Sequence, residues 1–524
     1  MTLIKNMNED FEMYLRDESR TVGHAEGIAF PTSEEEIRAV MRECYDSGEK
    51  VTVQGGRTGI AAAAVPYGGC ILNLSKMNRV LGMRKDEKGY YLTLQPGVVL
   101  SELRKMIGSK SFNMSGWSEE AKAVWADFKK DGSWFFSPDP TETSATIGGM
   151  VNCNASGARS FLYGPTRNHV TSVTMVLADG RTITAKRGID QRATGYEAVF
   201  TCDDGSLLRA PIPTYEMPPT KNASGYFAAK DMELIDLLIG SDGTLGVISE
   251  VEVRLLPQPK VIWGTSLLFE DELSSLRFVD RVRREVAGIA SMEFFDSGAL
   301  NVLRDQKAKS SAFSALPEIK PFVDTVIYVE LHCDDKEQAM ERLRGVADVF
   351  EAVGGKLENS WVAMNSKDID RLMFFRHAVP ESVNMLIDER KKVDKRIGKV
   401  GSDMSVPDAY LFEVVELYRN SLAEQKLQTA TWGHVGNNHL HVNVLPNDME
   451  EHARAKEMFK GWAKVICPMG GAVSAEHGVG KLKAPFLTIM YGEDHIEEMR
   501  ELKRAFDPKW MLGVGNLFSE NKNE

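Results

Sequence analysis

Three of the ten histidines of this chain lie within a single stretch, TWGHVGNNHLHVNV, at residues 431–444. They are His434, His439 and His441. From His439 onward, polar and apolar residues alternate, and this period of two is typical of a strand with one buried face. On such a strand His439, His441 and Asn443 project from the same side, so two imidazoles and an amide would face a common space.

A second polar segment, SAEHGVGK at residues 474–481, adds Glu476 and His477. A turn at residues 436–438 could bring His434 back beside the strand. Two or three imidazoles and one carboxylate form a ligand set that suits a borderline divalent metal such as zinc or manganese. The alternative is an ordinary sheet whose solvent face is rich in histidine.

The backbone around Glu476 and His477 must be irregular if both side chains serve one pocket. In a regular strand, two neighbours point to opposite faces. Gly478 and Gly480 permit a backbone that turns both side chains toward the same space. The segment is therefore a candidate for a division of labour between a carboxylate and the imidazole next to it.

The composition is that of a water-soluble chain with more than one domain, since 43% of the 524 residues are hydrophobic and 26% are charged. The net charge of −12 argues against a nucleic-acid surface, which needs a basic stripe. The six cysteines are scattered without a CxxC pair, which suits a reducing compartment. The N-terminus lacks the apolar core of a signal peptide, and no apolar run has membrane length. We therefore expect a cytoplasmic protein, with peripheral attachment to a membrane left open.

The first half of the chain has an α/β pattern, beginning with a predicted helix at residues 32–47 that Ser33 can cap. A strand, Val51–Gln54, leads into a glycine-rich loop, GGRTG, at residues 55–59. Backbone N–H groups of such a loop, together with Arg57, would form an anion-binding nest suited to a pyrophosphate. The loop matches neither the dinucleotide pattern nor the P-loop pattern, so a plain tight turn is the alternative.

A second segment of small residues, SPDPTETSATIGGMVNCNASG, covers residues 137–157. Segments of this kind wrap a flat ligand or pack backbone against backbone. Residues 107–135 form a less patterned insertion, and residues 186–222 are irregular and rich in proline, so we expect a surface excursion there. Pro257 and Pro259 break the pattern and indicate a domain boundary.

The second half of the chain alternates long amphipathic helices with strands. Strands are expected at residues 325–331 and 439–444. Together these elements predict an antiparallel sheet that helices cover on one face. The helices are expected at residues 270–286, 336–353, 407–426 and 450–465.

Five segments of the chain occur in an order that is typical of one protein family. They are VTVQGGRTG (51–59), PDPTETSATIGGMVNCNASG (138–157), GSDGTLGVI (240–248), GHVGNNHLHVN (433–443) and AEHGVGK (475–481). With them the chain resembles the FAD-binding flavoproteins of vanillyl-alcohol-oxidase type, and within these the D-2-hydroxyacid dehydrogenase branch. That branch includes D-lactate dehydrogenase, the glycolate oxidase flavoprotein subunit and D-2-hydroxyglutarate dehydrogenase. The similarity extends from about residue 26 to 518, and its specificity lies in the conjunction of the motifs.

The resemblance implies an α+β fold with two lobes. Residues 26–257 would form an FAD-binding domain of vanillyl-alcohol-oxidase type. Residues 258–505 would form a substrate or cap domain, built on the antiparallel sheet covered by helices. Residues 1–25 would be an N-terminal lead-in, and residues 506–524 a tail that returns to the FAD domain.

The resemblance also implies that FAD binds along the small-residue segments, with its pyrophosphate in the glycine loop. Some relatives attach FAD covalently through a histidine in this first loop. Arg57 occupies that neighbourhood here, so we expect FAD to be bound without a covalent link. The expected FAD-binding residues are Gly55, Gly56, Arg57, Thr58, Gly59, Pro138, Thr146, Gly148, Gly149, Asn152, Ser156, Gly157, Asp242 and Ile248, the last two near the nucleotide end.

For the chemistry, the resemblance implies that a D-2-hydroxy acid is oxidised by metal-assisted proton abstraction and hydride transfer to flavin N5. His434, His441 and Glu476 would bind the divalent metal, zinc or manganese. His477 would accept the proton as general base.

Two further residues would hold the substrate. Arg376 lies where the branch carries a carboxylate-binding arginine, and a guanidinium can pair with a carboxylate through two hydrogen bonds. Asn443 shares the predicted strand face of His441 and could hydrogen-bond the substrate. The electrons would pass to a protein or quinone acceptor, and a homodimer is compatible with the chain.

The chain departs from the branch in its histidine motif. Where the branch usually shows GHxGDGNxH, this chain has Asn437, Asn438 and His439. The extra imidazole could change the ligand set, or fill a pocket made for a different substrate.

Two alternative functions remain open. One is an oxidase of aromatic alcohols, or a non-redox flavoenzyme of the same fold. The other is a non-catalytic flavin subunit that only relays electrons. The first would not require His434, His441 and Glu476 as metal ligands, and the second could also lose His477.

Overall fold

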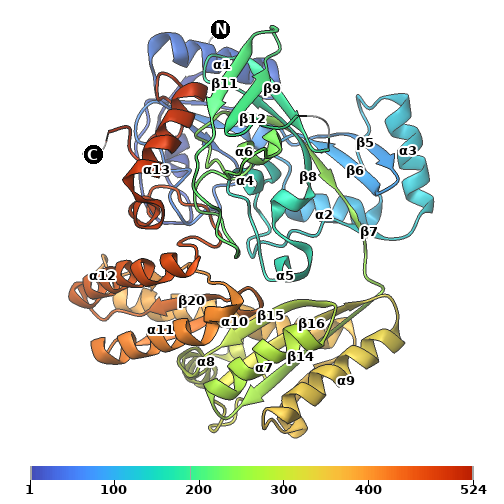
Figure 1. Cartoon of the computed structure of the whole chain (residues 1–524), viewed down its shortest axis with the longest axis vertical. Coiled ribbons are helices and arrows are strands. Elements are labelled where there is room, and N and C mark those ends of the chain that lie inside the picture. Colours follow the sequence, from blue (N-terminus) through green and yellow to red (C-terminus); the bar gives the residue numbers. More distant parts are fainter. Residues whose placement is uncertain (1–2, 189–190, 315, 522–524) are drawn as a thin grey trace.

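The computed structural model describes residues 3–188, 191–314 and 316–521, and it has two lobes (Figure 1). The first lobe, coloured blue to green, lies above the cap, coloured yellow-green to orange. The last long helix, α13 (Ala484–Phe506), lies beside the first lobe. The predicted α+β class with two lobes is confirmed.

The first lobe contains a small sheet with strand order β1-β2-β4-β3. Strands β2 (Gly27–Ala29), β4 (Cys70–Asn73) and β3 (Val51–Gln54) run parallel, and β1 (Lys5–Asn6) pairs antiparallel with β2. Helix α1 (Glu34–Ser47) precedes β3 and packs its apolar face on this sheet. Ser33 caps the helix, because its hydroxyl accepts a hydrogen bond from the Glu36 N–H at 3.3 Å. The predicted helix, its cap and the strand before the glycine loop are therefore confirmed.

The second sheet of this lobe is antiparallel, with strand order β5-β6-β12-β8-β9. Beneath it lies the short helix α4 (Ile147–Asn152), which is part of the second small-residue segment. The strands are β5 (Val80–Asp86), β6 (Gly89–Leu94), β12 (Val247–Arg254), β8 (Val170–Val176) and β9 (Thr182–Lys186).

Two stretches that we expected to be irregular contain regular structure. Residues 107–135 include helix α3 (Glu119–Lys130). Its apolar residues Ala121, Val124, Trp125 and Phe128 follow the i, i+3, i+4, i+7 pattern of a helix and pack on the core of the lobe. Residues 186–222 include the hairpin β10 (Glu197–Thr201) and β11 (Leu207–Pro211). Alternate residues of this hairpin are buried in the lobe's core, so the expectation of a surface excursion was wrong for it.

The cap is built on a seven-stranded sheet in which every pair is antiparallel. The predicted strand at residues 439–444 is confirmed as β20. The order is β17 (Ser360–Ala363), β14 (Val261–Phe269), β16 (Thr325–Cys333), β15 (Ile289–Phe295), β19 (Thr429–His434), β20 (His439–Val444) and β18 (Val400–Gly401).

Helices cover both faces of this sheet, so the expectation of one covered face was wrong. Ile327 and Val329 of β16 pack with α7 (Glu272–Glu285) and α9 (Lys336–Ala352). The alternate residues of that strand pack with α8 (Ser297–Lys309) and α10 (Ser366–Lys391). The physical reason is that β16 is buried on both sides along its whole length.

The remaining helices close the cap and lead the chain back to the first lobe. Helices α11 (Leu411–Gln425) and α12 (Met449–Ile466) pack around β18 and β20. Helix α13 packs against β11 and contributes to the core of the first lobe. The predicted domain limits at residues 257 and 505 stay predictions. Among the described residues, no helix is both long and apolar enough to cross a membrane.

Candidate active site

The hairpin of β19 and β20 places three imidazoles on one side of the cap sheet. Its register sets His434 opposite His439 and Trp432 opposite His441. The chain reverses at Asn438, whose φ of 50° is left-handed. The ring centroids of His439 and His441 are 4.3 Å apart, and that of His434 is 5.5 Å and 5.7 Å from them.

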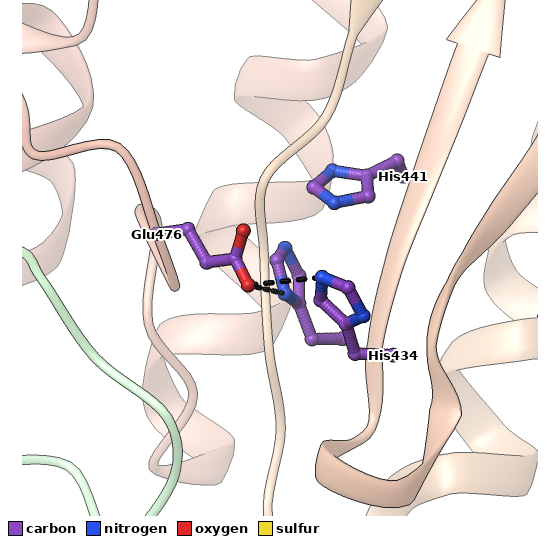
Figure 2. A group of neighbouring side chains, drawn as sticks. His434, His441 and Glu476 are labelled. Carbon is purple, nitrogen blue, oxygen red and sulfur yellow. Dashed lines mark ion pairs between the residues drawn. The ribbon is translucent and has the colours of Figure 1, made fainter. Parts of the chain in front are cut away.

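Glu476 comes from the loop before α13 and faces the same imidazoles (Figure 2). Its Oε1 is 3.0 Å from His434 Nε2 and 3.8 Å from His439 Nδ1. One ligand atom from each of His434, His439, His441 and Glu476 lies within 4.8 Å of the others. The structure therefore brings the predicted ligands together and adds His439 to them.

The second ring nitrogen of each imidazole meets an oxygen acceptor. His434 Nδ1 is 2.6 Å from Glu293 Oε1, and His439 Nε2 is 2.7 Å from Asp403 Oδ1. His441 Nδ1 is 3.4 Å from the carbonyl oxygen of Ser402. Such outer contacts fix the orientation and tautomer of metal-binding histidines in proteins.

Charge is distributed unevenly over the cluster. Burial opposes a charge on His434, but Glu293 and Glu476 outweigh it and raise the pKa of His434 to about 9. Burial lowers the pKa of His439 to about 4. Burial, reinforced by His439, holds the pKa of His441 well below its usual value. At neutral pH the last two imidazoles are therefore neutral and each has a lone pair to offer.

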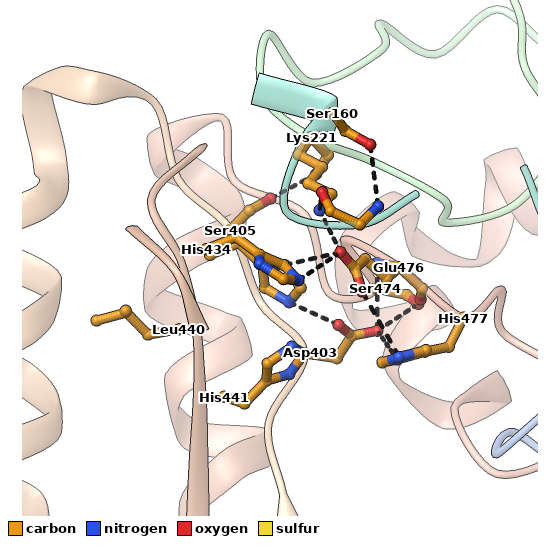
Figure 3. A network of polar contacts seen from close by, with 12 residues as sticks. Ser160, Lys221, Asp403, Ser405, His434, Leu440, His441, Ser474, Glu476 and His477 are labelled. Carbon is orange, nitrogen blue, oxygen red and sulfur yellow. Dashed lines mark hydrogen bonds and ion pairs between the residues drawn. The ribbon is translucent and has the colours of Figure 1, made fainter. Parts of the chain in front are cut away.

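Lys221 extends from the first lobe to the cluster, as Figure 3 shows. Its ammonium pairs with Glu476 Oε1 and also donates to the carbonyl of Gly157 at 3.2 Å. Burial opposes ionisation of Glu476, but Lys221 and His434 keep the pKa of Glu476 well below its usual value. Sequence reasoning missed Lys221, because nothing in the irregular stretch around it indicates a contact with a residue 255 positions away.

His477 lies beside the cluster with 30% of its side chain exposed. Its Nδ1 is 3.3 Å from Asp403 Oδ2, and its Nε2 is 3.6 Å from Glu476 Oε2. The backbone is left-handed at His477, Gly478 and Gly480, with φ of 68°, 69° and 51°. The irregular backbone expected here thus exists, and it brings both neighbours to one pocket.

Asp403 joins several of these groups and was also missed as a site residue. It is ion-paired with Lys483 and accepts hydrogen bonds from the Ser474 hydroxyl at 3.1 Å and from the ring of His439. Asp403 lies in the segment after β18, outside the named strands. Ser405 forms only isolated bridges, to His439 and Ala472.

Of the two predicted substrate-binding residues, Asn443 lies on strand β20 of the histidine hairpin and Arg376 lies beside the hairpin. Arg376 is on α10, and its Nε donates to Glu293 Oε2 at 2.8 Å, the same carboxylate that holds His434. Asn443 is 3% exposed, and its amide donates to the carbonyl of His441 at 2.9 Å. Their substrate roles stay predictions.

The two glycine-rich segments of the first lobe meet each other. A Cβ on Gly55 would overlap the Thr146 hydroxyl, and one on Gly56 would lie 2.8 Å from the carbonyl oxygen of Ser144. A Cβ on Gly157 would overlap the backbone of residue 139. Of the two interpretations of these segments, packing of backbone against neighbouring atoms is observed at these glycines.

The other expected FAD-binding residues have partners within the first lobe and in the loop before α13. The guanidinium of Arg57 lies 4.4 Å from the Tyr14 ring centroid and contacts the Met13 carbonyl. Asp242 accepts the N–H groups of Val479 and Gly480 at 2.8 Å each. Ile248 is fully buried in the core, Thr58 is half-buried, and Gly59 has open space at its Cβ position. The carbonyl of Pro138 accepts a hydrogen bond from Arg104, and the Gly149 N–H donates one to the Thr146 hydroxyl. Gly148 packs on Pro96.

Unpartnered polar atoms test whether this surface fits FAD. Among the described residues, Asn152 Oδ1 and Ser156 Oγ are buried without a hydrogen-bond partner. A cavity of about 220 Å³ adjoins Ser156 and extends to Asn222, Asn437 and Ala475. Asn222 Nδ2 and Asn437 Oδ1 also lack partners. Because buried polar groups are normally satisfied, these residues fit a polar group bound between the lobes.

Comparisons with known proteins agree with this arrangement. A family model described as FAD binding domain matches residues 25–114 and 123–186, and one described as FAD linked oxidases, C-terminal domain, matches residues 258–517. D-lactate dehydrogenase of Anaerostipes hadrus is 27% identical over 98% of this chain and 93% of its own length. Glycolate oxidase subunit GlcD of Bacillus subtilis is 25% identical over 95% and 89%.

A solved structure shares the fold across both lobes. It is 4-ethylphenol oxidase from Gulosibacter chungangensis, with a TM-score of 0.64, 14% identity, and coverage of 99% of this chain and 95% of its own. The two domain models match in the order in which the two lobes occur. The chain therefore belongs to the FAD-linked oxidases, flavoprotein oxidoreductases with the vanillyl-alcohol-oxidase fold.

Proposed function

We propose that this protein oxidises D-2-hydroxy acids of the lactate, glycolate or 2-hydroxyglutarate type to 2-oxo acids, with non-covalent FAD and a divalent metal, zinc or manganese. The observation that supports it most is the cluster itself, in which donor atoms of three imidazoles and Glu476 lie within 4.8 Å of one another. His477 lies beside this cluster. A metal-ligand set next to an imidazole base suits the oxidation of an α-hydroxy acid, because the metal would lower the pKa of the hydroxyl and the base would accept its proton.

Two bound groups supply chemistry that side chains lack. FAD, held by the first lobe along residues 55–59 and 146–157, supplies a hydride acceptor. A metal ion on His434, His441 and Glu476 supplies a Lewis acid that lowers the pKa of the substrate hydroxyl. The buried atoms without partners at Asn152 and Ser156 support the first assignment, and the close grouping of donor atoms around Glu476 supports the second.

His477 is the general base in this proposal. Its Nε2 faces Glu476 and would accept the hydroxyl proton. Asp403, 3.3 Å from Nδ1, would orient the ring and stabilise the imidazolium that forms. The substrate thus loses one proton from its hydroxyl and one hydride from Cα, and a 2-oxo acid remains.

Arg376 and Asn443 would recognise the substrate carboxylate. Because the Nε of Arg376 is bonded to Glu293, recognition falls to its two terminal nitrogens. A guanidinium arranged in this way binds a carboxylate at a fixed orientation relative to the metal ligands. The proposed acceptor of the electrons is a protein or a quinone, and the proposed assembly is a homodimer.

The decisive experiment mixes the FAD-loaded protein, without oxygen, with a panel of D-2-hydroxy acids and follows flavin bleaching. We expect bleaching by at least one of them, abolished by EDTA and restored by zinc or manganese. The variant His477→Ala should keep its FAD and its metal but reduce the rate of bleaching by about 10²–10⁴, the usual contribution of a general base. A fully active His477→Ala variant would remove that role.

The same measurements separate the alternatives. Bleaching by an aromatic alcohol that EDTA does not affect would favour an aryl-alcohol oxidase, a chemistry that does not use the metal ligands. Flavin that is reduced only by another protein would favour an electron-relay subunit. The presence of His477 beside the cluster argues against the relay, since a relay has no need of a base.

A further inference from the structure

We propose that His439 is a fourth protein ligand of the metal, so that three imidazoles and one carboxylate hold the ion. This inference rests on the metal site of the proposed function and goes beyond the ligands His434, His441 and Glu476. It concerns the additional imidazole of the segment GHVGNNHLH, which lies between His434 and His441 in the sequence. An imidazole at that position changes both the number and the kind of donors.

The position of the ring carries the inference. His439 is completely buried, and within the described part of the chain its Nδ1 has no hydrogen-bond partner. That nitrogen points into the cluster, 3.8 Å from Glu476 Oε1. A buried imidazole nitrogen without a partner is costly, and a metal ion would satisfy it.

The opposite nitrogen shows which atom is available to the metal. Nε2 of His439 is 2.7 Å from Asp403 Oδ1, so a proton on Nε2 is held there and the lone pair lies on Nδ1. His434 is held by Glu293 in the same manner. All three imidazoles of the hairpin thus have the arrangement of metal-binding histidines, with an oxygen acceptor behind the ring.

A ring that merely filled space would not need this arrangement. The pairing of β19 with β20 sets His439 directly opposite His434, on the side that faces Glu476. Three of the four donors therefore come from one hairpin and are positioned before any ion binds. A set with three nitrogen donors favours zinc or cobalt over magnesium and calcium, which prefer oxygen.

The test compares His439→Asn with the wild-type protein, both loaded with FAD. His332→Asn is the matched control, because His332 is another buried imidazole on a carboxylate of the same sheet, 2.8 Å from Glu330 Oε1. Zinc affinity is measured by competition with a chromophoric chelator, and the ligand field by the visible absorption of the cobalt-substituted proteins.

We expect His439→Asn to weaken zinc binding by more than the roughly 10–100-fold that loss of an outer contact costs, and to change the cobalt spectrum. His332→Asn should leave both unchanged. Equal affinity and an identical cobalt spectrum in His439→Asn would overturn the proposal while leaving the ligands His434, His441 and Glu476 in place. A wild-type protein that binds no metal would instead overturn the metal role in the proposed function, and this inference with it.

A second measurement covers a His439→Asn variant that fails to fold, as judged by its thermal melting and FAD content. A crystal structure of the zinc-loaded wild-type protein should place Nδ1 of His439 about 2.0–2.1 Å from the metal. A separation clearly outside bonding distance, above about 3 Å, would overturn the proposal.

Discussion

Two buried glutamates on neighbouring strands of the cap sheet have closely similar partners. Glu293 on β15 accepts from Arg376 Nε at 2.8 Å and contacts His434 at 2.6 Å. Glu330 on β16 accepts from Arg159 Nε at 2.7 Å and contacts His332 at 2.8 Å. Both glutamates project from the same face of the sheet, since Ser291 pairs with Glu330 and Glu293 with Tyr328.

The two sites differ at the far nitrogen of each histidine. The second nitrogen of His332 is 2.7 Å from the Tyr163 hydroxyl, so both ring nitrogens of His332 have hydrogen-bond partners. The second nitrogen of His434 faces Glu476 and the other imidazoles. The same arginine–glutamate–histidine arrangement therefore ties the lobes together at Glu330, through Arg159 of the first lobe, and orients a proposed ligand at Glu293.

Removing each histidine in turn should separate the two sites most clearly. His434→Ala should lose the metal and slow flavin reduction by about 10³ or more, because a Lewis acid contributes several kcal/mol and each 1.36 kcal/mol is tenfold in rate. His332→Ala should retain the metal and most of the rate. Metal content and stopped-flow bleaching measure both. Equal losses in the two variants would contradict a special role for His434.

Replacing each glutamate by glutamine should affect metal affinity at one site and the free energy of unfolding at the other. Glu293→Gln is expected to weaken metal binding by roughly 10–100-fold, since it removes the charge behind His434 and leaves one acceptor oxygen where His434 and Arg376 now use two. Glu330→Gln should leave that affinity unchanged and cost about 2–3 kcal/mol in the free energy of unfolding, less than a fully buried pair because Arg159 is 32% exposed. Chelator competition and urea denaturation give the two numbers.

The stability contribution of Glu330 should depend on pH. Burial opposes ionisation of Glu330, but His332 and Arg159 outweigh it and hold the pKa of Glu330 well below its ordinary 4.5. A carboxyl with a depressed pKa stabilises the fold above its unfolded pKa and loses that contribution as pH falls below it. The stability difference between wild type and Glu330→Gln should therefore narrow below about pH 4.5. A difference that is constant with pH would contradict the ion pair.

Replacing each arginine by lysine should have a smaller effect, which falls on substrate binding. Arg376→Lys keeps the charge but removes the fork that can bind a carboxylate, so the KM for the hydroxy acid should rise by about tenfold or more. Arg159→Lys should leave KM unchanged. Steady-state kinetics with an artificial electron acceptor provide the comparison. An unchanged KM in Arg376→Lys would exclude it as the carboxylate anchor.

The smallest expected effect is that of Tyr163→Phe. The change removes one hydrogen bond to His332 and should cost about 1 kcal/mol of stability. It should alter neither metal content nor flavin reduction, because His332 has no free nitrogen toward the cluster. A loss of metal in this variant would mean that the two sites are coupled through the sheet.

Local patterns predicted the elements that carry the site better than the contacts within it. The alternation after His439 gave the strand and the correct face, and the cap of α1 was evident from Ser33. Glu293 and Glu330 were missed, although each is the lone carboxylate of a largely apolar strand, which is a usable signal of a buried partner. Lys221 and Asp403 had no local signal, because their partners lie far away along the chain.

The ammonium of Lys221 occupies one oxygen of the carboxylate that a divalent ion would use. Before such an ion arrives, the buried carboxylate already has a counter-charge, so the centre can fold without leaving an isolated anion in a low-dielectric interior. Loading would then be an exchange of cations, in which the lysine withdraws as the ion enters. Lys221 belongs to the first lobe, and its partner Glu476 belongs to the segment before α13. This exchange would therefore change a contact that joins two distant parts of the chain.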